Sequence, residues 1–185
     1  MFKNIFNSFL KIKYFDLNLK SIKNKCLKIK KNNPNGDYFS NKGGWQSRKF
    51  NEEKPFEDLF NEINKCVFEI VDKIKIKKPI YLKNYWININ YFGCFNKPHH
   101  HHGQDCVISG VYYINTPLNS GNIVFLQPNY LNYQEVTEYN EYNSDFWEIP
   151  CQENQCVLFP SYLEHYVEPN LNKKERISIS FNYGF

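Results

Sequence analysis

The stretch "IYLKNYWININYF" (residues 80–92) decides the fold, because the hydrophobic pattern changes its period at this point of the chain. Upstream of Pro79, apolar residues recur at the spacing of an amphipathic helix. From residue 80 on, apolar and polar residues alternate, which is the pattern of a half-buried β-strand. The sequence therefore predicts a helical N-terminal part, residues 1–79, and a strand-rich part, residues 80–185.

Two helices are predicted in the N-terminal part. The first covers residues 16–31 and has Asp16 as a candidate N-cap. The second covers residues 54–78, with Pro55 in its first turn. Its apolar residues form one stripe: Phe56, Leu59, Phe60, Ile63, Val67, Ile70, Val71 and Ile74. The segment between the helices, residues 32–50, is rich in Pro, Gly and Asn and is predicted to be a loop.

Short strand-like segments follow one another in the second part. Besides 80–92, they are residues 106–115, 122–127, 146–150, 155–160, 165–169 and 176–183. Many short strands joined by Gly, Pro and Asn turns indicate a β-sandwich or barrel. We therefore predict a mainly β (α+β) fold, a double-stranded β-helix or jelly roll as in cupins, with the N-terminal helices packed on one sheet. With 185 residues, the chain (1–185) is expected to form a single domain.

Charge is distributed unevenly along the chain. Of the 23 basic residues, 19 precede residue 84, whereas ten of the 19 acidic residues follow it. A lysine-rich region can bind nucleic acid or a membrane surface, but solvated helix faces explain it more simply, and we favour that interpretation.

The cysteines and the hydropathy pattern indicate a reducing compartment. The six cysteines include no C-x-x-C pair and are scattered over predicted strands and a helix, as reduced thiols are: Cys26, Cys66, Cys94, Cys106, Cys151 and Cys156. No run of about 18 apolar residues and no convincing signal peptide is present. We therefore expect no membrane association and a cytoplasmic location, the host cytoplasm if the chain is viral.

Four of the five histidines are consecutive, in "PHHHH" (98–102). Taken alone, such a run fits a fragment of a tag, a solvated loop that binds metal weakly, or a built metal site. Its position directly before the strand-like segment 106–115 makes the third interpretation worth testing against the rest of the chain.

The run offers two pairs of residues that can bind one ion. Residues i and i+2 of a strand share a face, so His99 can act with His101, or His100 with His102. The fifth histidine, His165, lies at the far end of the strand-rich part. Two ligands from one strand and a distant third leave coordination positions open, as a catalytic metal requires.

The segment "RISISFN" (176–182) adds a candidate anion site. Alternation places polar residues on one face and apolar residues on the other: Arg176, Ser178, Ser180 and Asn182 against Ile177, Ile179 and Phe181. A buried arginine is costly unless it meets a carboxylate, which its planar fork binds through two hydrogen bonds. The strand therefore indicates an anionic small molecule beside the metal.

These residues together resemble a known signature. The pattern His-x-(Asp/His) … His-x10-Arg-x-Ser is similar to that of 2-oxoglutarate/Fe(II)-dependent dioxygenases. More specifically, the chain resembles the 2OG-Fe(II) oxygenases of phages and marine bacteria, which have a prolyl-hydroxylase-like double-stranded β-helix. The segments that carry the resemblance span roughly residues 14–185: 40–47, 86–93, 98–114, 120–128 and 159–182.

The resemblance implies which histidines bind the metal. In prolyl-hydroxylase-like relatives the first ligand follows a glycine by six residues, and here that position after Gly93 is His99. The implied ligands are therefore His99, His101 and His165. Counting back from "SGVYYI" (109–114) favours the other pair of the run instead, so both registers stay open.

The third ligand departs from the family pattern. The usual set is two histidines and one carboxylate, whereas here the second position is histidine in either register. Asp105 is nearby but is not two residues from any histidine. Either the metal has three imidazole ligands, or Asp105 completes the site, or the metal is not iron.

The resemblance also implies the cofactors, which are Fe(II), 2-oxoglutarate and O2. The distal carboxylate of 2-oxoglutarate would pair with Arg176, which completes the catalytic set. It would accept a hydrogen bond from Ser178 or from one of two tyrosines, Tyr112 or Tyr113. Asn88, on the strand before the histidines, is either a further contact in the site or an ordinary packing residue.

The implied function is hydroxylation of a peptide or protein side chain or of a small metabolite, with release of succinate and CO2. The long acidic segment 129–147 and the glycine-rich segment 41–47 are candidate lids. An acidic mouth disfavours a nucleic-acid substrate and favours a basic or neutral peptide. The alternatives are a cupin-like protein with a three-histidine zinc or nickel site and no oxygenase activity, and an inactive phage interaction protein.

Overall fold

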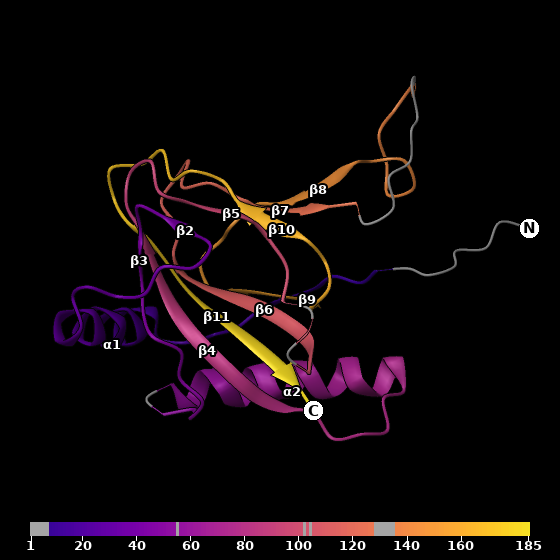
Figure 1. Cartoon of the computed structure of the whole chain (residues 1–185), viewed down its shortest axis with the longest axis horizontal. Helices are drawn as coiled ribbons and strands as arrows, with labels where there is room; N and C mark the ends of the chain where they lie inside the picture. Colours follow the sequence, from indigo (N-terminus) through magenta and orange to yellow (C-terminus); the bar gives the residue numbers. More distant parts are fainter. Residues whose placement is uncertain (1–7, 55, 102, 104, 128–135) are drawn as a thin grey trace, which may run out of the picture.

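Two antiparallel sheets face each other in the computed structural model, which describes residues 8–54, 56–101, 103, 105–127 and 136–185 (Figure 1). The larger sheet has the order β1 (Lys11–Tyr14), β9 (Gln155–Pro160), β6 (Cys106–Asn115), β11 (Arg176–Gly184), β4 (Tyr81–Asn90) and β3 (Trp45–Gln46). The smaller sheet has the order β2 (Asn41–Lys42), β5 (Phe95–His99), β10 (His165–Val167), β7 (Ile123–Leu126) and β8 (Phe146–Ile149). From β4 onward the chain crosses repeatedly between the two sheets, which is a jelly-roll topology. The predicted fold class is confirmed.

Both helices pack on the larger sheet (Figure 1). α1 (Leu19–Asn32) and α2 (Glu57–Ile74) share one apolar cluster with β4, β6, β9 and β11. At its centre, the rings of Phe60 and Tyr85 lie 4.7 Å apart. The N-cap of α1 is Asn18, whose side chain accepts a hydrogen bond from the Ser21 amide, and not Asp16. The position predicted for Pro55 lies outside the described residues.

Every strand predicted after residue 80 is present, but four strands were not predicted. Three of these, β1, β2 and β3, come from the part predicted to be helix and loop, and each lies at an edge of its sheet. Two-residue strands such as β2 and β3 carry no readable alternation, so the sequence pattern cannot reveal them. The first 79 residues therefore contribute both the helical layer and edge strands of the two sheets.

The space between the sheets is only partly filled by apolar side chains. A small cluster that includes Phe125, Val157 and Phe159 occupies one part of it. The remainder is a cavity lined largely by polar side chains from both sheets. No helix in the described part of the chain is long and apolar enough to span a membrane.

Candidate metal and cosubstrate site

Three histidines meet in the cavity between the sheets. His99 is the last residue of β5 and His165 the first residue of β10, and these two positions pair in the antiparallel register. His101 lies two residues beyond β5, where its backbone N–H donates to the Ser161 carbonyl at 2.8 Å. One ring nitrogen from each histidine lies within 4.8 Å of the other two, which is close enough to bind a single ion.

Backbone carbonyls fix the orientation of two of these rings. His99 Nδ1 donates to the Lys97 carbonyl at 2.7 Å, and His165 Nδ1 donates to the Leu163 carbonyl at 2.9 Å. Because a carbonyl can only accept, Nδ1 carries the proton in both rings. Nε2 is then left with a lone pair, which is the arrangement that metal-binding histidines have.

All three imidazoles are held in their neutral form. Burial is the largest cause that lowers the pKa of each ring, and it lowers the pKa of His101 to about 3. The neighbouring rings of the cluster lower the pKa values of His101 and His165 further. A neutral imidazole is the form that binds a metal, so the cluster is ready for one without first losing protons.

The other residues considered as ligands lie elsewhere. His100 is exposed, and His102 is outside the described residues. Asp105 is exposed, has a backbone φ of 54°, and does not belong to the cluster. Within the part of the chain that the structure describes, the cluster therefore consists of three imidazoles and no carboxylate.

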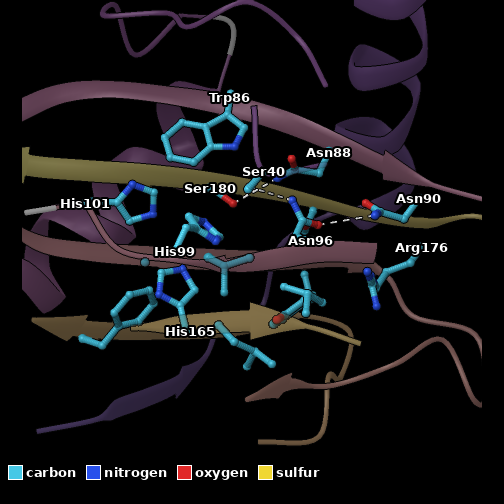
Figure 2. Close-up of a pocket in the computed structure, with 17 residues that line it drawn as sticks. Ser40, Trp86, Asn88, Asn90, Asn96, His99, His101, His165, Arg176 and Ser180 are labelled. Carbon is cyan, nitrogen blue, oxygen red and sulfur yellow. Dashed lines mark hydrogen bonds between the residues drawn. The ribbon is translucent and has the colours of Figure 1, made fainter. Parts of the chain in front are cut away.

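Arg176 lies at the opposite end of the same cavity (Figure 2). It is 2% exposed, and its Nη1 donates to the carbonyls of Ser120, Gly121 and Glu168. Its Nη2 is buried and has no hydrogen-bond partner. Among the described residues no carboxylate pairs with this guanidinium. A buried cation with an unused donor is expected to bind an anion.

Ser178 and Tyr113 also line the cavity. They are cross-strand neighbours on β11 and β6. The Tyr113 hydroxyl is buried with no hydrogen-bond partner other than the neighbouring Cys151 thiol, which is a weak acceptor. Burial, followed by this thiol, raises the pKa of Tyr113 well above the ordinary value. The hydroxyl therefore keeps its proton and can donate it to a stronger acceptor in the cavity.

Tyr112 does not reach the cavity. Its ring stacks on Phe15 at 5.6 Å within the helix-covered cluster, and its hydroxyl donates to Asn154 Oδ1 at 2.6 Å. The sequence left the two tyrosines as alternatives, and alternation along β6 separates them, since neighbouring residues of a strand face opposite sides. Tyr112 therefore belongs to the helix-covered core, and we do not propose a role for it in cosubstrate binding.

A polar wall completes the cavity, and the sequence pattern singled out only Asn88 and Ser180 among its residues. Asn88 Nδ2 donates to Ser180 Oγ at 3.0 Å, Asn90 Nδ2 to Asn96 Oδ1 at 3.4 Å, and Asn96 Nδ2 to Ser40 Oγ at 3.1 Å (Figure 2). Asn90 and Asn96 are 3% and 8% exposed. Because asparagine is abundant throughout this chain, the sequence alone does not distinguish Asn90 and Asn96 from surface asparagines. Their burial becomes apparent only from the pairing of the strands.

The donor set fits a metal ion together with a dicarboxylate. Three neutral imidazoles at one end suit a divalent transition metal. The unused donors of Arg176 and Tyr113 at the other end suit a carboxylate. A small molecule that chelates the metal with one end and carries a carboxylate at its other end would use both the imidazole cluster and the unused donors.

The "putative 2OG-Fe(II) oxygenase" family matches residues 84–182, which include every residue of this donor set. The chain belongs to this family. Membership implies Fe(II), 2-oxoglutarate and O2 as cofactors, and the histidine cluster fits an iron site. No curated protein sequence matches the chain.

Solved structures of low sequence identity share the fold. A prolyl-4-hydroxylase from Pseudomonas putida superposes with a TM-score of 0.69 at 12% identity, over 95% of this chain and 91% of that one. The viral collagen prolyl hydroxylase from Paramecium bursaria chlorella virus-1, in complex with 2-oxoglutarate, gives a TM-score of 0.63 at 12% identity, over 94% of each chain. HygX from Streptomyces hygroscopicus, with nickel and 2-oxoglutarate bound, gives 0.62 at 9% identity, over 96% and 83%.

Proposed function

We propose that this chain is an Fe(II)- and 2-oxoglutarate-dependent dioxygenase that hydroxylates a peptide or protein side chain or a small metabolite. The metal ligands in this proposal are His99, His101 and His165. The observation that carries it is the presence of this neutral cluster and of the unpaired Arg176 guanidinium in one buried cavity.

Each residue of the cavity has a defined task in this proposal. Arg176 binds the distal carboxylate of 2-oxoglutarate through Nη2, while its Nη1 stays anchored to backbone carbonyls. Tyr113 donates its free hydroxyl to the same carboxylate, and Ser178 lies beside both. Asn88 lines the cavity, donates a hydrogen bond to Ser180 through Nδ2 and has an unpartnered Oδ1. The apolar side chains Phe159 and Ile123 line the cavity and limit the entry of water.

When bound, Fe(II) would supply the oxidative chemistry, in which 2-oxoglutarate and O2 would give succinate, CO2 and the hydroxylated substrate. The chain itself orients the cosubstrate and keeps the imidazoles neutral.

The test is the anaerobic addition of Fe(II) and 2-oxoglutarate to purified protein. We expect a visible charge-transfer band that Arg176→Ala abolishes, because the cosubstrate loses its carboxylate partner. The matched control is Arg48→Ala, which removes the chain's other arginine, an exposed residue over the Phe50 ring. A folded wild-type protein without the band contradicts the proposal, and so does a band that Arg176→Ala leaves unchanged.

A second candidate function rests on the absence of a carboxylate from the described cluster. Three imidazoles also suit zinc or nickel, as in a cupin-like protein without oxygenase activity. Metal analysis of protein purified without added iron separates the two. Stoichiometric zinc together with no succinate release from 2-oxoglutarate supports this second function.

The remaining proposals concern context. We propose that residues 1–185 form one domain, which is supported by the participation of β1, β2 and β3 in the two sheets. We propose a cytoplasmic location, which is supported by six free cysteines, four of them buried.

An inactive interaction protein is the interpretation to adopt if His165→Ala and His101→Ala change neither metal content nor activity.

A further inference from the structure

A second, more open groove adjoins the histidine cluster on the outer side of the cavity. His99, His101 and Trp86 line both the cavity and the groove, so a molecule in the groove lies next to the candidate metal ligands. This is the position that a primary substrate must occupy for a metal-centred reaction. The chemistry of the groove therefore bears on the substrate.

The groove is basic. Lys49 and Lys97 line it, and no aspartate or glutamate does so among the described residues. Lys42 lies beside Lys97, whose charge is the largest cause that lowers the pKa of Lys42. Within the described part of the chain, none of these three lysines has a carboxylate partner. The ammonium groups of Lys42 and Lys97 repel each other, and a bound anion would relieve this repulsion.

Aromatic rings hold one of these charges beside the metal ligands. Lys49 Nζ lies 5.4 Å from the centre of the Phe39 ring and 5.9 Å from that of Trp86. The Trp86 ring in turn lies 5.6 Å from the His101 ring, centre to centre. A substrate anion bound by Lys49 is thus placed close to the reacting centre.

The groove also contains an unpartnered carboxamide. Gln46 is 2% exposed, and its Oε1 is buried with no hydrogen-bond partner. Asn88, its cross-strand neighbour on β4, lines the cavity and not the groove. A carboxamide pairs with a peptide group, because each offers an acceptor and a donor at the same spacing. A carboxylate or phosphate alone has no N–H group for Gln46 Oε1.

We propose that the primary substrate is an acidic peptide segment whose backbone binds Gln46 and whose carboxylates bind Lys49, Lys97 and Lys42. The proposal rests on the proposed function, because it places the segment beside the candidate metal ligands. The acidic mouth expected from segment 129–147 does not form this groove, since none of its described residues, 136–147, lines it. A single-stranded nucleic acid fits less well, because only its bases carry N–H donors, whereas a peptide presents a backbone N–H at nearly every residue for Gln46 Oε1.

The test measures binding and needs no turnover. Fluorescein-labelled glycine–alanine peptides of equal length, rich in glutamate, in glutamine or in lysine, are titrated anaerobically against protein loaded with Fe(II) and 2-oxoglutarate, and against metal-free protein. A poly-dT oligonucleotide is measured alongside. We expect the glutamate peptide to bind about tenfold more tightly than the glutamine peptide, and the lysine peptide to bind most weakly.

Variants assign the effect to the groove. Lys49→Gln and Lys97→Gln should each weaken binding of the glutamate peptide about three- to tenfold and leave the glutamine peptide unchanged. Gln46→Leu should weaken both peptides by a similar factor. The matched control is Lys65→Gln, which removes an exposed lysine on α2, across the larger sheet from the groove, and should change neither.

Three outcomes overturn the proposal: equal binding of the three peptides, tighter binding of poly-dT than of the glutamate peptide, or a Lys65→Gln effect equal to that of Lys49→Gln. Peptide binding is measured without turnover, so it can be evaluated even if the charge-transfer band of the earlier test is absent. Conversely, if the protein turns over 2-oxoglutarate but binds the three peptides equally, the proposed function stands and the proposed acidic peptide substrate is wrong.

Discussion

The two faces of the larger sheet are built from the same strands but have opposite chemistry. On β11, one set of alternate residues packs against the helices and the other lines the cavity: Ile177, Ile179 and Phe181 against Arg176, Ser178 and Ser180. The helix-covered face is apolar and closely packed. The cavity-facing face carries buried polar atoms without partners, at Asn88, Tyr113 and Arg176.

Because of this difference, neighbouring residues of one strand contribute either to stability or to ligand binding. Apolar burial on the helix-covered face is the main source of folding free energy. Buried polar groups without partners oppose folding, and they persist where a ligand completes their hydrogen bonds. Substitutions at neighbouring positions of one strand should therefore affect different properties.

The largest loss of stability is expected for Phe181→Ala, on the helix-covered face. The Phe181 ring is fully buried, packs edge-on against Phe60, and covers Gly110, where a side chain would clash with it. Removal of such a ring costs about 3–5 kcal/mol of the free energy of unfolding, which urea denaturation measures. Ser180→Ala, one position away on the cavity side, loses only the hydrogen bond from Asn88 and should cost about 1 kcal/mol. Equal losses in the two variants would refute the separation of the two faces.

The second effect is a dependence of stability on pH between pH 7 and pH 5, which we expect to arise mainly from the histidines on the cavity side. Folding lowers the pKa values of His99, His101 and His165, so the unfolded chain binds more protons below its ordinary histidine pKa of about 6.5. Stability of the metal-free protein is then fully present above that pH and is lost as the pH falls. With a folded pKa of about 3, His101 alone should account for about 2 kcal/mol between pH 7 and pH 5.

Urea titrations of metal-free protein at a series of pH values measure this loss. His101→Asn should reduce the slope of stability against pH, since one titrating group is gone. Phe181→Ala should lower stability by the same amount at every pH, because no proton is linked to its burial. A slope that His101→Asn leaves intact would assign the acid sensitivity to other groups.

The third effect concerns two glycines with similar backbone angles. Gly121 has a φ of +84°, and a Cβ there would lie 2.8 Å from Arg176 Nη1 and 2.5 Å from the Glu168 carbonyl. Gly93 has a φ of +78° and open space around the same position. Gly121→Ala should cost about 1–3 kcal/mol and weaken 2-oxoglutarate binding, whereas Gly93→Ala should cost about 1 kcal/mol through backbone strain alone. Calorimetric titration with 2-oxoglutarate distinguishes them, and equal affinity in both variants contradicts a role for Gly121 in seating Arg176.

The sequence predicted most of this architecture wherever alternation was regular. β6 and β9 were predicted with their observed bounds, and the faces of β11 were assigned correctly, because strands of this length show their period. The same reasoning from i and i+2 offered two histidine pairs, and the family resemblance favoured His99 with His101, the pair that the structure brings together with His165. His101, however, lies beyond the end of β5, and the Ser161 carbonyl, not strand geometry, positions it.

What the sequence could not predict depended on pairing between distant segments. β5 was missed, because Lys97 and Pro98 interrupt its alternation. The basic groove brings Lys49, which follows β3, next to Lys97 of β5, and no local pattern links positions so far apart. The unpartnered state of Gln46 likewise exists only in the folded chain.

The smallest effect is the sharpest test of the comparison, because Tyr112 and Tyr113 are neighbours on β6 with opposite orientations. Tyr113→Phe removes a hydroxyl that has no oxygen or nitrogen partner in the protein, so stability should change by less than about 0.5 kcal/mol, while the KM for 2-oxoglutarate should rise about five- to tenfold. Tyr112→Phe removes the hydrogen bond to Asn154, so it should cost about 1 kcal/mol and leave KM unchanged. Urea denaturation and succinate release measure the two quantities in both variants. If both variants change the KM for 2-oxoglutarate, the two faces of the sheet do not have separate roles. If Tyr113→Phe destabilises the protein as much as Tyr112→Phe, the Tyr113 hydroxyl contributes to folding and is not available to bind the cosubstrate.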